Sequence, residues 1–132
     1  MQYIPVIARI LFAAIFLAAA PRHFTGEGIA HAGELGVPLA RLAVPLSGVL
    51  AILGALSVLV GYQARLGALA LICFLVPVTL MMHAFWRVTD PVQVHFQQAM
   101  FMKNVSMLGG ALLLLYFGAG PLSIDHARTL GG

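Results

Sequence analysis

The sequence contains little cysteine and little charge. Its single cysteine, Cys73, has no second cysteine to pair with, so an intramolecular disulfide and a CxxC redox pair are both excluded. Charged residues make up 8% of the 132 residues and hydrophobic residues 61%, whereas a soluble domain is about 25% charged and about 45–50% apolar. Together with a mean hydropathy of +1.01, this composition indicates an integral membrane protein.

Runs of basic residues are also missing. Seven Lys and Arg stand against four Asp and Glu, which gives a formal net charge of +3. The basic residues are scattered singly and are not interleaved with aromatic residues, so nucleic-acid binding is not expected. In a multi-pass membrane protein a small basic excess favours contact with anionic head groups, which makes membrane lipids the first predicted partners.

The sequence shows no recognisable catalytic motif. It has no nucleophile, base and acid set, no phosphate-cradling glycine loop and no carboxylate pair at catalytic spacing. Five histidines are present, but none has the dense spacing of metal ligands, such as HxxxH on one helix. We therefore expect no metal site, no covalently held cofactor and no stand-alone enzyme.

Long apolar runs dominate the chain instead. A bilayer-spanning helix needs roughly 20 apolar residues, and the sequence predicts four spanning helices, over residues 4–20, 39–60, 66–86 and 99–117. Pro21 directly follows the first run and disfavours signal-peptide cleavage there, so we expect that run to be a retained helix. The predicted fold is an all-α, integral membrane four-helix bundle, forming one domain over residues 1–132 in a bacterial inner (plasma) membrane.

Polar connectors separate the predicted spans. The longest follows the first run and is predicted to hold a short interfacial helix around residues 29–35, whereas residues 87–98 are predicted as a loop. An even number of spans places both termini on one side of the membrane. Most of the histidines then fall on the opposite side, at His23, His31, His83 and His95.

Small residues recur at a spacing of four within the spans. Such pairs let helices approach closely in lipid, where packing drives association. They are Ala14 and Ala18, Ala51 and Ala55, and Ser106 and Gly110.

Several blocks of the chain carry a family pattern. Residues 83–86 read HAFW, residues 101–115 read FMKNVSMLGGALLLL, and residues 118–125 read GAGPLSID. These blocks resemble the HxFW, FxKNxxxxGG and GPGxxSxD elements of the DoxX family of small four-helix membrane proteins, and they occur in the same order. The turn GYQAR (61–65) is similar to the family's GxxxR element.

The resemblance extends to the first helix but is incomplete. Arg9 and Phe16 match the family's RLLxxxxF opening. Many members carry Glu in the second helix, at a place where this chain reads AILGA (residues 51–55). The first helix of the family usually ends in GxxK, whereas this chain reads APRH (residues 20–23). The resemblance implies a link to quinone-dependent thiosulfate oxidation and to membrane redox complexes.

The predicted ligand site lies where the third helix ends and the fourth begins. Its members are His83, Trp86, Lys103 and Asn104, which would hold a quinone carbonyl or another polar head group. Ionisable groups inside a membrane are costly and therefore functional candidates. Each residue also has a structural interpretation. Lys103 can snorkel toward the head groups, and Trp86 can anchor the interface. Asn104 can hydrogen-bond across the bundle to a neighbouring helix, and His83 can bond to a carbonyl or to Asn104.

A structural ion pair is predicted at the other end of the bundle. Arg9 lies within the first helix, and Asp125 follows the exit from the fourth. The alternation of spans places both near one interface, where a buried arginine is stabilised by a partner. Arg65 is expected to complete this pair.

These features predict a small accessory or quinone-linked subunit of a membrane redox or respiratory complex. Its partners would be other subunits of that complex, and quinone would be its possible non-covalent cofactor. The alternatives are a structural, assembly or lipid-binding subunit without ligand chemistry, and a small-molecule transporter that works as an oligomer.

Overall fold

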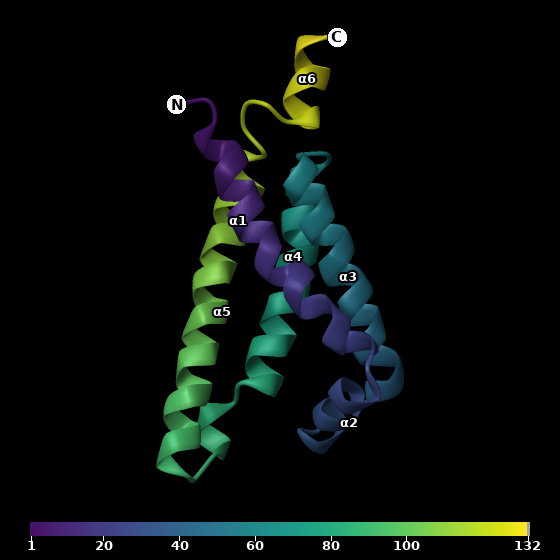
Figure 1. Cartoon of the computed structure of the whole chain (residues 1–132), viewed down its shortest axis with the longest axis vertical. Coiled ribbons are helices and arrows are strands. Elements are labelled where there is room, and N and C mark those ends of the chain that lie inside the picture. Colours follow the sequence, from purple (N-terminus) through teal and green to yellow (C-terminus); the bar gives the residue numbers. More distant parts are fainter. Residues whose placement is uncertain (132) are drawn as a thin grey trace.

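The computed structural model describes residues 1–131, which fold into helices joined by short loops (Figure 1). The last residue of the predicted domain, Gly132, lies outside the described residues. The elements in chain order are α1 (Ile4–Ala19), the 3-10 turn η1 (Ala20–Phe24), α2 (Gly26–Glu34), α3 (Ala40–Val60), α4 (Ala64–Met82), the 3-10 turn η2 (Phe85–Arg87), α5 (Pro91–Phe117) and α6 (Ile124–Leu130).

The predicted all-α membrane fold is confirmed. Four stretches are long and apolar enough to cross a membrane, namely Ile4–Phe24, Ala40–Val60, Ala64–Arg87 and Pro91–Phe117. No strand interrupts the helices between residues 1 and 131. Both termini and the short α6 lie at one end of the bundle, and α2 lies at the other (Figure 1).

Two predicted helix ends are wrong. α4 ends at Met82 rather than at residue 86, because His83 leaves the helix with φ −122° and ψ 38°. α5 begins at Pro91 rather than at residue 99, and the Asp90 carboxylate caps it by accepting a hydrogen bond from Gln93 N at 3.3 Å. Hydropathy placed the polar first turns of α5 in a loop, but a capped N-terminus with proline at its first position continues the helix beyond the apolar run.

The short interfacial helix predicted in the first connector is present as α2. Thr25 caps it, since its hydroxyl oxygen accepts a hydrogen bond from Gly28 N at 3.1 Å. The cap lies ahead of the predicted start, so α2 begins at Gly26.

The core forms where α3 crosses α4. A Cβ added at Gly54 would lie 3.0 Å from the carbonyl oxygen of Gly67, so only glycine permits this approach of the two backbones. Ala51 and Ala55 are 1% and 0% exposed, and they pack as the small-residue pattern predicts. The buried cluster comprises Ala13, Phe16, Ala51, Ala55, Val58, Leu71, Phe74 and Leu75.

The small-residue pattern in α1 predicts the wrong face. Ala14 and Ala18 are exposed, whereas Ala13 and Phe16 are buried against α3 and α4. In an almost uniformly apolar helix, every face contains small residues, so their spacing alone does not identify the packed face.

α5 lies at the edge of the bundle, against α4 (Figure 1). It also approaches α1, since a Cβ added at Gly110 would lie 2.8 Å from a ring carbon of Phe12. Among its 27 residues only Asn104 and Ala111 are buried. Most of the surface of α5 is therefore open to lipid or to a partner.

Candidate functional site

One group of polar side chains joins the end of α4 to the start of α5. His83 is half-buried just after the last turn of α4, and its Nδ1 lies 2.9 Å from Oε1 of Gln97 on α5. Because the amide oxygen of Gln97 can only accept, the neutral imidazole carries its hydrogen on Nδ1 and donates a hydrogen bond from there. Its Nε2 is then a hydrogen-bond acceptor. Lys103 and His31 lie within electrostatic reach of this imidazole.

The predicted Lys103 and Asn104 pair is split between two environments. Asn104 is buried, with 4% of its surface exposed. Lys103 is exposed, and its Nζ lies 3.7 Å from Sδ of Met100 one turn earlier on the same helix. Of the two, only Asn104 is on the inward side of α5.

Trp86 belongs to an aromatic cluster beside His83. Its ring centroid lies 5.2 Å from that of Phe85 and 5.8 Å from that of Phe101, both edge to face. Trp86 is 54% exposed, which agrees with a side chain that anchors the membrane interface.

Gln97 is the site residue that the sequence interpretation missed. It was assigned to a loop, and Asn104 was taken as the polar partner of His83. The start of α5 at Pro91 instead puts Gln97 on a helix, where Gln97, Asn104 and Ala111 follow at heptad spacing on one face. That spacing was the available signal, because the face it defines is the one that packs inward.

A second histidine, His23, has a packing role. Its Nδ1 lies 3.0 Å from Oγ of Ser47 and 3.3 Å from the carbonyl oxygen of Val44, both on α3. Its ring packs against Phe74 at 5.4 Å between centroids, and a Cβ added at Gly48 would lie 2.6 Å from His23 Cβ. Within residues 1–131 no three His, Cys, Asp or Glu side chains are grouped so as to hold a metal ion.

The opposite end of the bundle is built around Arg9 of α1. This arginine is 3% exposed, and its Nη2 donates a hydrogen bond to the carbonyl oxygen of Leu122 at 2.7 Å. Its Nε and Nη1 are buried and make no hydrogen bond within the described part of the chain. Gly61 leaves room for this guanidinium, since a Cβ added there would contact Arg9 Nη1.

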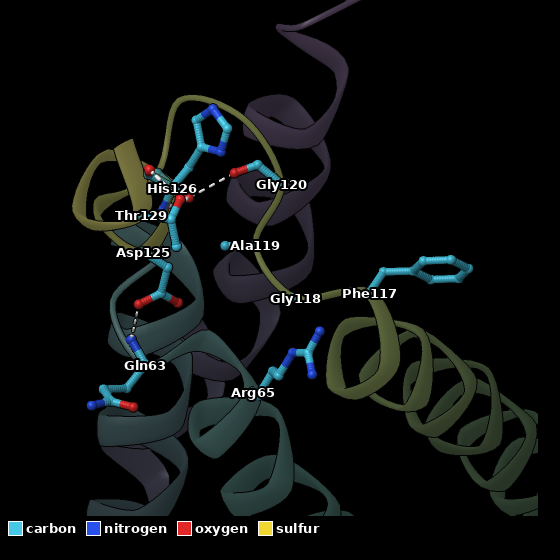
Figure 2. Close-up of a pocket in the computed structure, with 10 residues that line it drawn as sticks. Gln63, Arg65, Phe117, Gly118, Ala119, Gly120, Asp125, His126 and Thr129 are labelled. Carbon is cyan, nitrogen blue, oxygen red and sulfur yellow. Dashed lines mark hydrogen bonds between the residues drawn. The ribbon is translucent and has the colours of Figure 1, made fainter. Parts of the chain in front are cut away.

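Asp125 ties the C-terminal segment to the turn between α3 and α4. Its carboxylate accepts a hydrogen bond from Gln63 N at 2.8 Å (Figure 2). It also accepts one from Ala64 N at 2.9 Å, and the N–H of Asp125 donates to Gly61 O at 2.8 Å. The carboxylate therefore caps the N-terminus of α4, where the helix dipole favours a negative charge.

The predicted pairing of Arg9, Asp125 and Arg65 takes a different form. All three lie at one end, and Asp125 is within electrostatic reach of Arg9, but the hydrogen bonds of Arg9 and Asp125 go to the backbone. Figure 2 shows the Arg65 side chain directed toward Gly118 and Phe117 at the end of α5, away from the Asp125 carboxylate. Arg65 and Asp125 line a hollow of about 460 Å³.

Comparison with known proteins assigns the chain to a different family from the one expected. The model of the SURF4 family matches residues 42–129. The inner membrane protein YphA of Escherichia coli (strain K12) is 30% identical over 123 residues, which cover 92% of this chain and 87% of that protein. No solved structure matches.

The predicted membership of the DoxX family is wrong, because the match to the SURF4 family model overturns it. The resemblance rested on short blocks, such as residues 61–65, 83–86 and 118–125. The family match and the four apolar helices agree instead on one assignment. The chain belongs to the SURF4 family and is an integral, multi-pass inner membrane protein.

Proposed function

We propose that this protein is a small, non-catalytic membrane subunit that binds the head group of a quinone at the His83 and Gln97 pair. In this role it supports a membrane redox complex whose other subunits hold the electron-transfer cofactors. The observation that carries the proposal is the 2.9 Å hydrogen bond between His83 Nδ1 and Gln97 Oε1. It joins the residue that follows α4 to a residue of α5 through two neutral polar side chains.

The hydrogen bond prepares His83 for a ligand. Because Nδ1 donates to Gln97, the neutral imidazole presents Nε2 as an acceptor for the hydroxyl group of a reduced quinone. The buried amide of Asn104 lies on the same face of α5 as Gln97 and has donors for a ligand carbonyl. Polar side chains at membrane depth are functional candidates, since burying them there is costly.

The aromatic cluster supports the same ligand class. Phe85 follows His83 by two residues, and Phe101 is on the facing helix α5. Their rings pack edge to face with centroids 5.4 Å apart. Flat aromatic surfaces pack well against a planar ring through offset or edge contacts. A quinone head would place its ring against this cluster and its oxygens toward His83 and Asn104.

The test is retention of quinone by the purified protein. Wild type, His83→Ala and His95→Ala are extracted from native membranes in mild detergent, and the small molecules that remain bound are identified by mass spectrometry. His95 is an exposed histidine on α5 and serves as the matched control. We expect wild type and His95→Ala to retain quinone and His83→Ala to lose most of it.

Two results contradict the proposal. One is the absence of quinone from the wild-type protein when it is present in the starting membranes. The other is equal retention by His83→Ala and His95→Ala, which would place the quinone in the surrounding detergent and lipid.

A second candidate function is a purely structural or assembly subunit. Its support is the exposure of α5, in which only Asn104 and Ala111 are buried among 27 residues. Leu113 on α5 and Leu53 on α3 are both 61% exposed, so they form a matched pair for testing. If α5 is the docking face, Leu113→Trp reduces co-purification of the partner subunit, whereas Leu53→Trp and His83→Ala leave it unchanged.

A further inference from the structure

Two hollows meet at Arg65, at the end of the bundle that carries the termini. The first has a volume of about 460 Å³ and is lined mainly by the polar turn and loop residues around Asp125, including Gln63, Ser123 and Thr129. The second has a volume of about 740 Å³ and is lined by Arg65, Leu112, Leu115, Tyr116 and Phe117. Arg65 and Phe117 line both, so the polar hollow and an apolar groove along α5 adjoin at these two residues.

The donors of Arg65 are available to a ligand. Its side chain is exposed and makes no hydrogen bond or ion pair within residues 1–131. Gly118 at the end of α5 lies beside the guanidinium, since a Cβ added there would be 3.4 Å from Arg65 Nε, an ordinary contact distance. Arginine presents a planar fork of donors that matches the oxygens of a phosphate group.

The charge around the polar hollow is positive. Asp125 is the acidic residue in its lining, and both carboxylate oxygens already accept hydrogen bonds from backbone N–H groups of Gln63 and Ala64. Arg9 is buried close by, beside Ala119 and Ser123 at Gly61. Its Nε and Nη1 lack hydrogen-bond partners within residues 1–131, which leaves a second guanidinium charge incompletely compensated.

The position of the hollows matches the depth of a lipid head group. Arg65 is in the first turn of α4, and Tyr116 and Phe117 end α5, so all three lie at the boundary of the apolar spans. Aromatic residues are enriched at this boundary. The groove formed with Leu112 and Leu115 runs from it back toward the bilayer centre, as an acyl chain does.

We propose that this end of the protein is a binding site for an anionic phospholipid. Arg65 holds the phosphate, the polar hollow holds the rest of the head group, and one acyl chain lies in the groove along α5. Charge complementarity favours an anionic lipid over a zwitterionic one, and the apolar groove beside the polar hollow favours a lipid over a free anion.

The proposal is tested on the full chain in mild detergent. Thermal unfolding is measured with added phosphatidylglycerol, with phosphatidylcholine and with glycerol 3-phosphate, which carries the anionic group without acyl chains. We expect phosphatidylglycerol to raise the Tm in a saturable way, and the other two to leave it unchanged. An equal effect of glycerol 3-phosphate would show a free-anion site and overturn the proposal.

Variants separate a site from general attraction. Arg65→Gln and Arg87→Gln each remove one exposed arginine, the second at the opposite end of the bundle. Loss of a guanidinium contact to phosphate weakens binding by about tenfold, so this change is expected for Arg65→Gln alone. Equal weakening by both variants would mean attraction to net charge and would overturn the proposal.

The acyl-chain part has its own matched pair. Leu112 lines the groove, whereas its neighbour Leu113 does not, and the two are 51% and 61% exposed. We expect Leu112→Ala to weaken phosphatidylglycerol binding and Leu113→Ala to leave it unchanged. No difference between these two variants would contradict placement of the chain in this groove.

Discussion

The two polar ends of the bundle use their side chains in different ways. At the end that carries the termini, Arg9 and Asp125 bond to backbone groups of Leu122, Gln63 and Ala64. At the opposite end, His83 and Gln97 bond to each other, and each keeps further hydrogen-bonding capacity. Arg9 and Asp125 at the first end use their hydrogen bonds to hold backbone segments together, whereas His83 and Gln97 at the second keep capacity for a further partner.

The largest effect is expected from Gly61→Ala, at the terminus-bearing end. Gly61 has φ +68°, where alanine costs about 1–2 kcal/mol, and the added Cβ would also displace Arg9 from its contacts. We expect a total loss of about 3 kcal/mol, measured as a lower Tm in detergent. Gly109→Ala is the control, because a Cβ there meets nothing within 4 Å. An equal Tm for Gly61→Ala and the parent protein would contradict the structural role given to this end of the bundle.

The next effect compares the two aspartate caps. Asp125→Ala removes a charged acceptor from two backbone N–H groups and should lower stability by about 2 kcal/mol. Asp90→Ala removes a single 3.3 Å cap bond at the start of α5 and should cost about 0.5–1 kcal/mol. Thermal unfolding of both variants shows which loses more stability. A larger loss of stability for Asp90→Ala than for Asp125→Ala would contradict the stronger structural role given to the terminus-bearing end.

A smaller effect is expected for the coupling of His83 with Gln97. The single variants His83→Ala and Gln97→Ala and the double variant form a cycle that isolates their interaction. A neutral hydrogen bond contributes about 1 kcal/mol, and we expect a coupling energy of this size from their unfolding transitions. Additive losses would mean that the two side chains stabilise the protein independently.

The smallest effect is expected at Lys103. Its side chain is exposed, and within residues 1–131 its hydrogen-bond contact is the one to Met100 Sδ at 3.7 Å, so Lys103→Gln should change stability by less than about 0.5 kcal/mol. Asn104→Ala, at the neighbouring buried position, should lower the Tm by more. If the lysine variant were the less stable of the two, Lys103 would have a buried role that its exposure does not indicate.

Local sequence patterns predicted the helices well and their ends poorly. Apolar runs located every spanning helix, because hydrophobic length is a property of the sequence alone. The start of α5 at Pro91 and the end of α4 at Met82 were missed, because caps and backbone angles set these limits rather than hydropathy.

The candidate sites were predicted only in part, for the same reason. Alternation of spans correctly brought Arg9, Arg65 and Asp125 to one end, and His83 to the other. Gln97 was missed as the partner of His83, and Arg65 was not recognised as a boundary between two hollows. Both depend on which faces of α4 and α5 meet, and nearly uniform apolar helices leave few sequence marks of their packed faces.

The sequence by itself determined that this protein has four helices long and apolar enough to cross a membrane, with both termini at one end. The length and composition of the apolar runs, about 20 residues each, are the reason. Only the tertiary structure decided that Asp125 caps α4, that Arg9 bonds to Leu122 and that Gln97 meets His83. In lipid the backbone polar groups must be satisfied within the protein, and which polar side chains meet depends on the packing of helices distant in sequence.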